Sequence, residues 1–255
     1  MNESQPDVRS LMDIMPAEWQ QALELDDADI PVAVISEGSW WRAQRTDWRL
    51  GMLDDVRELV FPDMFLGRWH DRPIVYCCAY GAPRAVEVAH LFGSLGTRLA
   101  VQIGTCGGLQ GDLRPGDVVV PDIAICHEGI ASIYGAGERT SADSEWSATA
   151  RSNLEDRGFR VHNGIHLTWY SIFAQSGAMV EQWRDTGYLS VDMETATTLA
   201  VANHFDMSGV SLLVVWDELV RGRSFLDRMD RADQARLDRA NAAVFEVALD
   251  LVDAL

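Results

Sequence analysis

The chain has 255 residues, a hydrophobic content of 47% and a formal net charge of −18. This length suits one large α/β domain or two small ones, and the apolar content is enough for a packed core. The negative charge argues against binding to nucleic acid or to an anionic membrane, because both need a basic face. No apolar stretch is long enough to cross a bilayer, and the first residues lack the basic start and apolar core of a secretory signal. We therefore expect a cytoplasmic protein.

Residue usage excludes several kinds of chemistry. All 21 basic residues are arginine, so a Schiff-base lysine and a P-loop lysine are both ruled out. The four cysteines form no CxxC pair and lie in or beside apolar runs, which is typical of reduced thiols in a cytosolic protein. The six histidines form no HExxH motif, and no carboxylate or cysteine shares the spacing of His162 and His166. We therefore expect no metal site.

Apolar runs alternate with helical patterns along most of the chain. Residues 8–25 form an acidic, helical lead-in, and we assign residues 1–29 to an N-terminal extension. Residues 30–255 are expected to form one domain, because no linker-like stretch or internal repeat interrupts the pattern. In chain order the predicted elements are strands at 30–35 and 73–79, a helix at 84–95, strands at 99–103 and 118–120, a helix at 145–157, a strand at 165–170, a helix at 193–205, a strand at 210–215 and a helix at 227–255. This alternation predicts an α/β layer fold with a largely buried sheet.

Acidic residues stand at the ends of two predicted strands. The segment 188–198, YLSVDMETATT, holds Asp192 and Glu194 around Met193, where an extended run gives way to a helical pattern. Asp217 ends the next apolar run. Because strand ends in α/β folds meet at ligand sites, three carboxylates can converge there. Such a group suits the binding of a polyol and the protonation of a leaving group.

Glycine-rich turns and one arginine follow the other predicted strands. The candidates are residues 38–42, Gly81 and residues 105–108. Backbone N–H groups and a guanidinium in such turns can hold an anion. The chain has neither GxGxxG nor GxxxxGK[ST] at these places, which excludes the dinucleotide and P-loop forms of an anion site.

Three segments resemble one known family, the nucleoside phosphorylases of uridine and purine type, a superfamily that also contains water-using nucleosidases. VQIGTCGGLQGDLRPGDVVVPD, at 101–122, is similar to the family's central signature. VEQWRDTGYLSVDMETATTLAVA, at 180–202, resembles its ribose-binding segment, and GSWWR, at 38–42, resembles its first phosphate loop, Gly-x-x-x-Arg. The resemblance runs from about residue 22 to the C-terminus. It implies a single-domain three-layer α/β/α fold with a mixed central sheet, and a homo-oligomer that is a dimer or a hexamer.

The resemblance also implies roles for the acidic segment. Glu194 matches the carboxylate that accepts hydrogen bonds from the ribose 2′ and 3′ hydroxyls, and Met193 matches a residue that packs against the sugar. Asp192 binds at the same substrate site, at a position where the family usually has Glu. Asp217 matches the acid that protonates N7 of a purine base. Judged from the residues alone, Glu194 can instead be a charge at a helix N-terminus, and Asp217 can cap a turn.

The glycine-rich turns match the family's contacts to phosphate. The resemblance assigns phosphate binding to Gly38, Arg42 and Thr105, through a backbone N–H, a guanidinium and a hydroxyl. Thr105 and Gly107 are also assigned to the nucleoside. Phosphate is then a co-substrate, and no cofactor is implied.

Two arginines of the family's phosphate site are missing. Their positions hold Gln102 and Val60. Losing two guanidiniums weakens anion binding by several kcal/mol if each charged hydrogen bond contributes roughly 1.5–3 kcal/mol. The nucleosidases usually place a carboxylate at the position of Arg42, so this arginine favours an anion. Two interpretations are open for Glu37, which either activates a water or is solvated at the end of a strand.

The resemblance indicates less about the side that holds the base. Phe173 best matches an aromatic residue that contacts the base in the family. Trp169 and Tyr170 can stack on a base or belong to the core. The family has a further arginine after its catalytic acid, and the spacing leaves Arg221 and Arg223 open.

Three functions are therefore considered. The first is a nucleoside phosphorylase that cleaves a purine-type nucleoside with phosphate to give free base and pentose 1-phosphate. The second is a phosphate-independent nucleoside hydrolase of the same fold, in which Glu37 or Asp217 handles water. The third is a non-catalytic relative that binds nucleosides. In each case the expected partners are small molecules and further copies of the chain.

Overall fold

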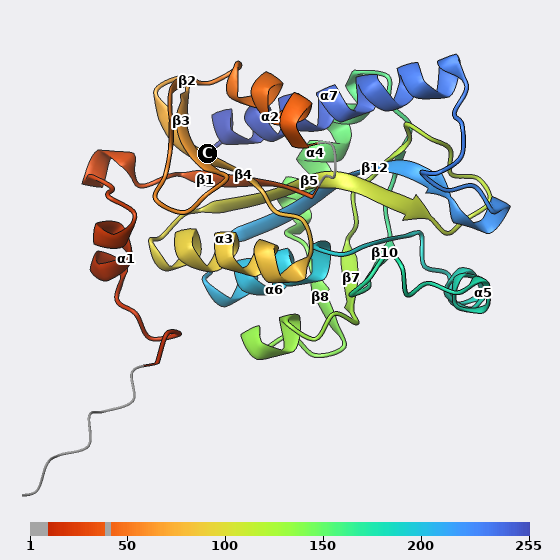
Figure 1. The fold of residues 1–255 in the computed structure, drawn as a ribbon, viewed down its shortest axis with the longest axis horizontal. Helices are drawn as coiled ribbons and strands as arrows, with labels where there is room; N and C mark the ends of the chain where they lie inside the picture. The colour runs from red at the N-terminus through yellow and green to blue at the C-terminus, as the bar shows by residue number, and fades with distance from the viewer. Residues whose placement is uncertain (1–9, 39–41) are drawn as a thin grey trace, which may run out of the picture.

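The computed structural model describes residues 10–38 and 42–255, with side chains for 10–38 and 45–255 (Figure 1). The predicted phosphate loop at 38–42 therefore lies partly outside the described residues. Gly38 is described as the end of a strand, and Arg42 is placed by its backbone alone, as the first residue of a helix.

A mixed β-sheet forms the centre of the fold. Within the described residues it has twelve strands, ordered β2-β3-β4-β1-β5-β11-β10-β7-β8, and β12 joins it through β5 and β6, with β9 beside β6. The strands are β1 (Ala33–Gly38), β2 (Asp54–Glu58), β3 (Met64–Trp69), β4 (Arg72–Cys78), β5 (Leu99–Gly108), β6 (Val118–Val119), β7 (Ile123–Cys126), β8 (Arg139–Ser141), β9 (Val161–His162), β10 (Ile165–Thr168), β11 (Ser190–Asp192) and β12 (Ser208–Glu218). The strands β4, β1, β5 and β12 are parallel to one another, whereas β3, β8 and β11 pair with neighbours in the antiparallel direction.

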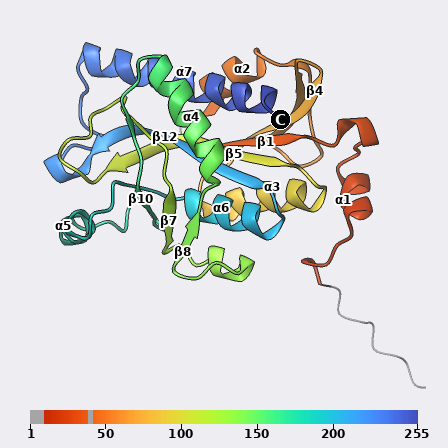
Figure 2. The same cartoon turned by 180° about the vertical axis from the view of Figure 1, so that it is seen from behind.

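Helices cover both faces of this sheet. The helices of the described residues are α1 (Pro16–Ala22), α2 (Arg42–Leu50), α3 (Ala82–Ser94), α4 (Ser144–Asp156), α5 (Gly177–Thr186), α6 (Thr195–His204) and α7 (Arg231–Asp253), with 3₁₀ turns η1 (Asp27–Asp29), η2 (Ala131–Tyr134) and η3 (Leu219–Arg221). Figure 1 shows α2 and α7 on one face and α3 and α6 on the other, and Figure 2 shows α4 beside α7. The helix α5 lies at one end of the molecule, away from both layers. The predicted three-layer α/β/α fold with a mixed central sheet is confirmed.

The two layers bury two separate apolar clusters. On one face, α7 contributes Phe245 and Leu249 to a cluster with Ile35, Val101 and the facing residues of β12. On the other face, residues of α3 pack against the opposite side of β1, β4 and β5. Because strand residues alternate between the two faces, β5 supplies both clusters, with Val101 on the side of α7 and Ala100 on the side of α3.

Side-chain caps set where three helices begin. Asp143 accepts hydrogen bonds at the start of α4, and Asp230 accepts the backbone N–H of Asp233 at the start of α7. Asp192 accepts the backbone N–H of Thr195 at 3.0 Å, where α6 begins. These caps explain why the predicted helices at 193–205 and 227–255 start two and four residues later in the structure.

Each predicted element has a counterpart in the described residues, but the strand predicted at 30–35 is β1 at Ala33–Gly38, and the helical lead-in is α1 at Pro16–Ala22. The strands β2, β3, β8 and β9 and the helices α2 and α5 had no prediction. β2 has the sequence DDVRE and is exposed along its length, so it lacks an alternating apolar pattern. The glycine-rich turn predicted after residue 103 is wrong in its first part, because β5 continues as far as Gly108. Glycine at 104 permits close approach, since a Cβ there would lie 3.0 Å from the carbonyl oxygen of Gly38.

Candidate active site

The sheet opens beside the C-terminal end of β1. β1 pairs with β5 in parallel as far as Gly38 and Gly104. Further along β5, Gly107 and Gly108 pair with β11 in the antiparallel direction. Because β12 occupies the other edge of β5 through Gly108, β1 and β11 must share one edge. The end of β1 and the segment after β11 therefore flank a break in the pairing.

A cleft lies at this break. The space between its walls, with open solvent at its mouth included, is about 740 Å³. The predicted site residues that line the cleft are Gly38, Thr105, Gly107, Asp192, Met193, Glu194 and Asp217. The other lining residues are Arg45, Tyr80, Cys106, Ile172, Gln175, Val191, Trp216, Leu219 and Phe225.

Asp192 is buried, and protein groups engage both of its carboxylate oxygens. Oδ1 accepts the Thr168 hydroxyl at 2.9 Å and lies 2.8 Å from Nε2 of His166. Oδ2 accepts the hydroxyl and the backbone N–H of Thr195 at 2.6 and 3.0 Å, and Gln102 donates to it at 3.4 Å. Burial would raise the pKa of Asp192, but His166 and the hydrogen bonds together lower it. Asp192 is therefore an ionised group that fixes the start of α6.

Glu194 presents its carboxyl group to the cleft. Oε1 accepts the backbone N–H of Gly81 at 2.5 Å, and Oε2 accepts that of Met193 at 3.3 Å. Burial raises the pKa of Glu194 to about 8, and the charge of Asp192 adds to the rise. Although Glu194 occupies the N-cap position of α6, its side chain makes no capping hydrogen bond. Its position therefore fits a contact to a ligand better than a charge at a helix end.

A β-bulge directs Asp217 into the cleft. The register between β12 and β5 shifts between Val215 and Asp217, so Trp216 is an extra residue on β12. The backbone N–H of Phe225 donates a hydrogen bond to Asp217, while Oδ1 is buried without a hydrogen-bond partner among the described residues. Burial raises the pKa of Asp217 to about 7, the hydrogen bond from Phe225 opposes the rise, and Asp227 adds to it. At neutral pH this carboxyl group is partly protonated.

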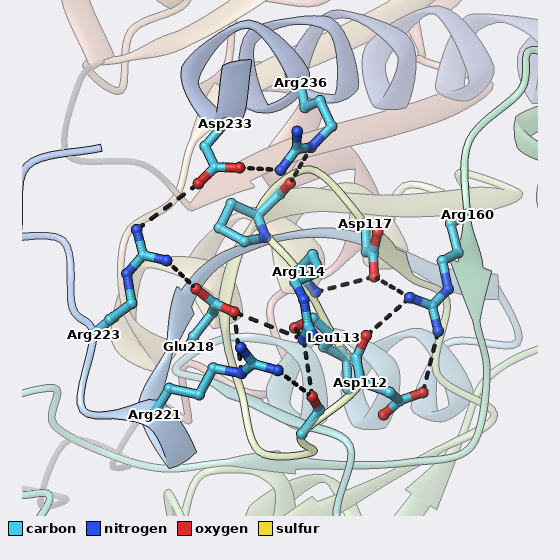
Figure 3. Close-up of polar contacts among 12 residues, drawn as sticks. Asp112, Leu113, Arg114, Asp117, Arg160, Glu218, Arg221, Arg223, Asp233 and Arg236 are labelled. Carbon is cyan, nitrogen blue, oxygen red and sulfur yellow. Dashed lines mark hydrogen bonds and ion pairs between the residues drawn. The ribbon is translucent and has the colours of Figure 1, made fainter. Parts of the chain in front are cut away.

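Both candidate arginines after Asp217 bind its neighbour, Glu218 (Figure 3). Glu218 is buried, and its Oε2 accepts Nη1 of Arg223 at 2.8 Å, while Nε of Arg221 lies 3.4 Å from Oε1. Arg114 reaches the same carboxylate at 3.8 Å. Among the described contacts, neither Arg221 nor Arg223 pairs with Asp217. Their charges therefore do not lower its pKa.

Glu37 lies behind the cleft and not at its surface. Its side chain is 1% exposed, so the interpretation of a solvated residue is wrong. Arg49 donates to it at 3.1 Å, and the Tyr76 hydroxyl donates at 2.8 Å. Glu37 is not among the residues that line the cleft, and these donors occupy its carboxylate. The geometry does not favour a role in activating water.

Phe173 does not lie where the predicted base contact would place it. Its side chain is 82% exposed and is not part of the cleft lining. The neighbouring residues Ile172 and Gln175 line the cleft instead, together with Phe225 from the loop after β12. Trp169 packs on Trp183, with ring centroids 5.3 Å apart, as its core interpretation predicts. Phe225 is thus an aromatic wall that no sequence pattern indicated.

The one thiol among the residues that line this cleft does not suit nucleophilic catalysis. Burial raises the pKa of the Cys106 thiol far above its ordinary value, so it stays protonated and suits a core position.

Within residues 10–38 and 42–255, no three His, Cys, Asp or Glu side chains are grouped so that they could hold a metal ion. Across the same ranges, no helix is long and apolar enough to cross a membrane.

Replacing Gly38 with Ala is expected to lower kcat/KM for the substrate of this cleft about 10- to 100-fold, because a small displacement of a group that binds substrate has effects of this size. A Cβ at residue 38 would lie 2.9 Å from the carboxyl carbon of Glu194, so that side chain must move. Steady-state kinetics test this prediction. Gly111→Ala is the matched control, because no atom lies within 4 Å of its Cβ position. Equal kcat/KM values for Gly38→Ala and Gly111→Ala would contradict the prediction.

Glu194 and Asp217 are each expected to destabilise the empty protein as the pH rises from about 4 to about 8. The pKa of Glu194 rises from 4.5 to about 8 and that of Asp217 from 3.8 to about 7, so the folded state holds protons that the unfolded state releases. Each group then lowers the unfolding free energy by at most about 1.4 kcal/mol per pH unit between its two pKa values. Urea unfolding at several pH values measures this slope. Glu194→Gln and Asp217→Asn should flatten it, and an unchanged slope in both would contradict the prediction.

The three-layer fold has an acid-lined cleft at a break in its sheet, and such a cleft suits a small polar ligand. The sequence model of the Phosphorylase superfamily matches residues 57–252. The chain belongs to this superfamily, as its sequence motifs indicated.

Individual relatives agree with this assignment. The guanosine phosphorylase of Halorubrum lacusprofundi is 27% identical over 243 residues, which are 92% of this chain and 99% of that protein. A DeoD-type purine nucleoside phosphorylase of Bacillus mycoides is 26% identical over 168 residues, 65% of this chain and 68% of that protein. The crystal structure of uridine phosphorylase from Vibrio fischeri has a TM-score of 0.78 at 19% identity, covering 92% of this chain and 98% of that chain. The last likeness shows the shared fold.

Proposed function

We propose that the protein cleaves a purine-type nucleoside with phosphate, giving free base and pentose 1-phosphate. The observation that carries this proposal is Asp217, a buried carboxyl group in the cleft wall whose pKa is raised to about 7. A general acid works best when its pKa lies near the working pH. The relatives named as guanosine and purine nucleoside phosphorylases support a purine base.

The proposed reaction divides the cleft between three groups. An oxygen of phosphate forms a bond to C1′ of the sugar while the C–N bond breaks, and the electron pair of that bond passes into the base. Asp217 donates its proton to N7 of the base, which neutralises the charge that develops there. Glu194 accepts hydrogen bonds from the 2′ and 3′ hydroxyls, and Met193 lies against the sugar. These interactions favour a transition state in which the sugar carries positive charge.

Gly38 and Thr105 line the side of the cleft from which the nucleophile would attack. In the proposed complex the Gly38 backbone N–H and the Thr105 hydroxyl donate to phosphate, with Arg42 as the guanidinium of the loop at 38–42. The hydrolase alternative loses one of its two candidates for handling water, because Arg49 and Tyr76 occupy Glu37 behind the cleft. This favours phosphate over water.

A panel of purine and pyrimidine nucleosides, assayed with and without phosphate, tests the proposal. We expect release of a purine base that needs phosphate and produces pentose 1-phosphate in equal amount. Base release that is indifferent to phosphate would support the hydrolase, and binding without turnover would support the non-catalytic relative. The proposed reaction needs phosphate as co-substrate and no cofactor. A homo-oligomer and a cytoplasmic location stay predictions of the sequence.

A further inference from the structure

We propose that Arg45 supplies a guanidinium to the attacking phosphate, in place of the family arginine whose position holds Gln102. The inference rests on the proposed phosphorolysis. Arg45 lies on α2, about one turn beyond Arg42, and so stands outside the Gly-x-x-x-Arg pattern. It lines the cleft together with Gly38 and Thr105. The amide of Gln102 is engaged elsewhere, through Asp192 and Thr195.

A buried cluster holds the side chain of Arg45 from behind. Glu37 accepts Nε of Arg49 at 3.1 Å and the hydroxyl of Tyr76 at 2.8 Å. Arg49 is 1% exposed and also donates to the backbone carbonyl of Asn241 at 2.7 Å. Nη1 of Arg45 lies 3.5 Å from Oε1 of the same Glu37 carboxylate. Glu37 is therefore a positioning residue for Arg45, whose side chain lies between this buried cluster and the cleft.

The charge of this cluster favours an anion in the cleft. Glu37 carries one negative charge, whereas Arg45 and Arg49 carry two positive charges, so the three residues together are cationic. The guanidinium of Arg45 also lies 5.8 Å from the ring centroid of Trp216, the bulge residue beside the catalytic acid. Burial lowers the pKa of Arg45, and Glu37 opposes this shift. A phosphate oxygen next to Arg45 would offset the cost of burying its charge, whereas a neutral water would offset much less.

Kinetics with phosphate and nucleoside varied separately test the inference. Arg45→Met is expected to raise KM for phosphate about 10- to 100-fold, which corresponds to one charged hydrogen bond, while KM for the nucleoside stays within about threefold. Arg45→Lys should recover part of the loss, because it retains the charge. Arg151→Met is the matched control, since Arg151 is also on a helix, is 24% exposed against 17% for Arg45, and binds a carboxylate, Asp122, outside the cleft. Arg151→Met should keep the wild-type constants.

A second measurement separates this inference from the proposed reaction. Phosphate alone should raise the melting temperature of the wild type and of Arg151→Met, and should raise that of Arg45→Met much less. If wild-type turnover does not need phosphate, the proposed reaction fails, and the melting shift still decides whether Arg45 binds phosphate. If turnover needs phosphate but Arg45→Met and Arg45→Lys both keep the wild-type KM for phosphate, the inference is overturned. Should Arg45→Met fail to fold by circular dichroism, the phosphate KM and melting shift of Arg45→Lys against Arg151→Met decide it in the same way.

Discussion

Replacing Asp217 with Asn is expected to lower kcat for purine nucleosides about 100- to 10,000-fold, the usual contribution of a general acid. Asn keeps the size of the side chain and can still accept the N–H of Phe225, but it has no proton to give to N7. Binding of the nucleoside should stay within about tenfold, because the contact that is lost forms mainly in the transition state. Single-turnover rates and equilibrium binding measure the two quantities separately.

Two controls assign this loss to proton transfer. A nucleoside methylated at N7 of the purine already carries the positive charge, so its C–N bond can break without the acid. Asp217→Asn should cleave it almost as fast as the wild type does. Asp112→Asn removes a carboxylate that binds Arg160 outside the cleft and should leave all rates unchanged. Equal losses with the methylated and the ordinary nucleoside would show that residue 217 is not the acid.

The sequence located the acidic half of the cleft because its signals are local. Asp192 and Glu194 follow one apolar run and Asp217 ends another. The strands β11 and β12 run in opposite directions, and the acids meet because β11 ends at the break beyond β1, close to the bulge of β12. Both acids line the cleft, and side-chain periodicity cannot say which of them has its carboxylate surrounded by other side chains. Asp192 and Glu194 differ in the structure because Thr168, Thr195, Gln102 and His166 surround only the first.

The sequence could not locate Arg45, because its role depends on contacts between distant segments. The helix α2 reads RAQRTDWRL and has few apolar residues, so beyond Arg42 of the Gly-x-x-x-Arg pattern nothing distinguishes Arg45 from Arg49. Arg45 faces the cleft because Glu37, on β1, and Tyr76, on β4, lie together in the parallel sheet. In the same way the family resemblance indicates Phe173 as the base contact, whereas the path of the loop brings Ile172 to the cleft. The register of paired strands and the path of a loop depend on tertiary contacts, so a local sequence pattern does not predict them.

Replacing Glu194 with Gln is expected to lower kcat/KM for nucleosides about 100- to 10,000-fold, if two charged hydrogen bonds to the sugar contribute roughly 1.5–3 kcal/mol each. Gln keeps the shape and can still accept the N–H of Gly81, but it has no charge to strengthen as the sugar becomes cationic. A 2′,3′-dideoxy nucleoside lacks both hydroxyls, so it should be a poor substrate for the wild type and should lose much less from the substitution. A loss as large with the dideoxy substrate as with the ribonucleoside would show that Glu194 does not bind the diol.

The pH dependence of kcat/KM tests the assigned states of both acids together. Glu194 must be ionised to act, and its pKa is about 8, so activity should rise with pH on this account. Asp217 must be protonated, and its pKa is about 7, so activity should fall with pH on that account. The wild type should therefore show a bell with its maximum between these values, because kcat/KM reports the ionisations of the free enzyme. Glu194→Gln should keep only the fall, and Asp217→Asn only the rise. Each variant removes the part of the pH profile that its own residue causes. If Glu194→Gln kept only the rise and Asp217→Asn kept only the fall, the two roles would be exchanged.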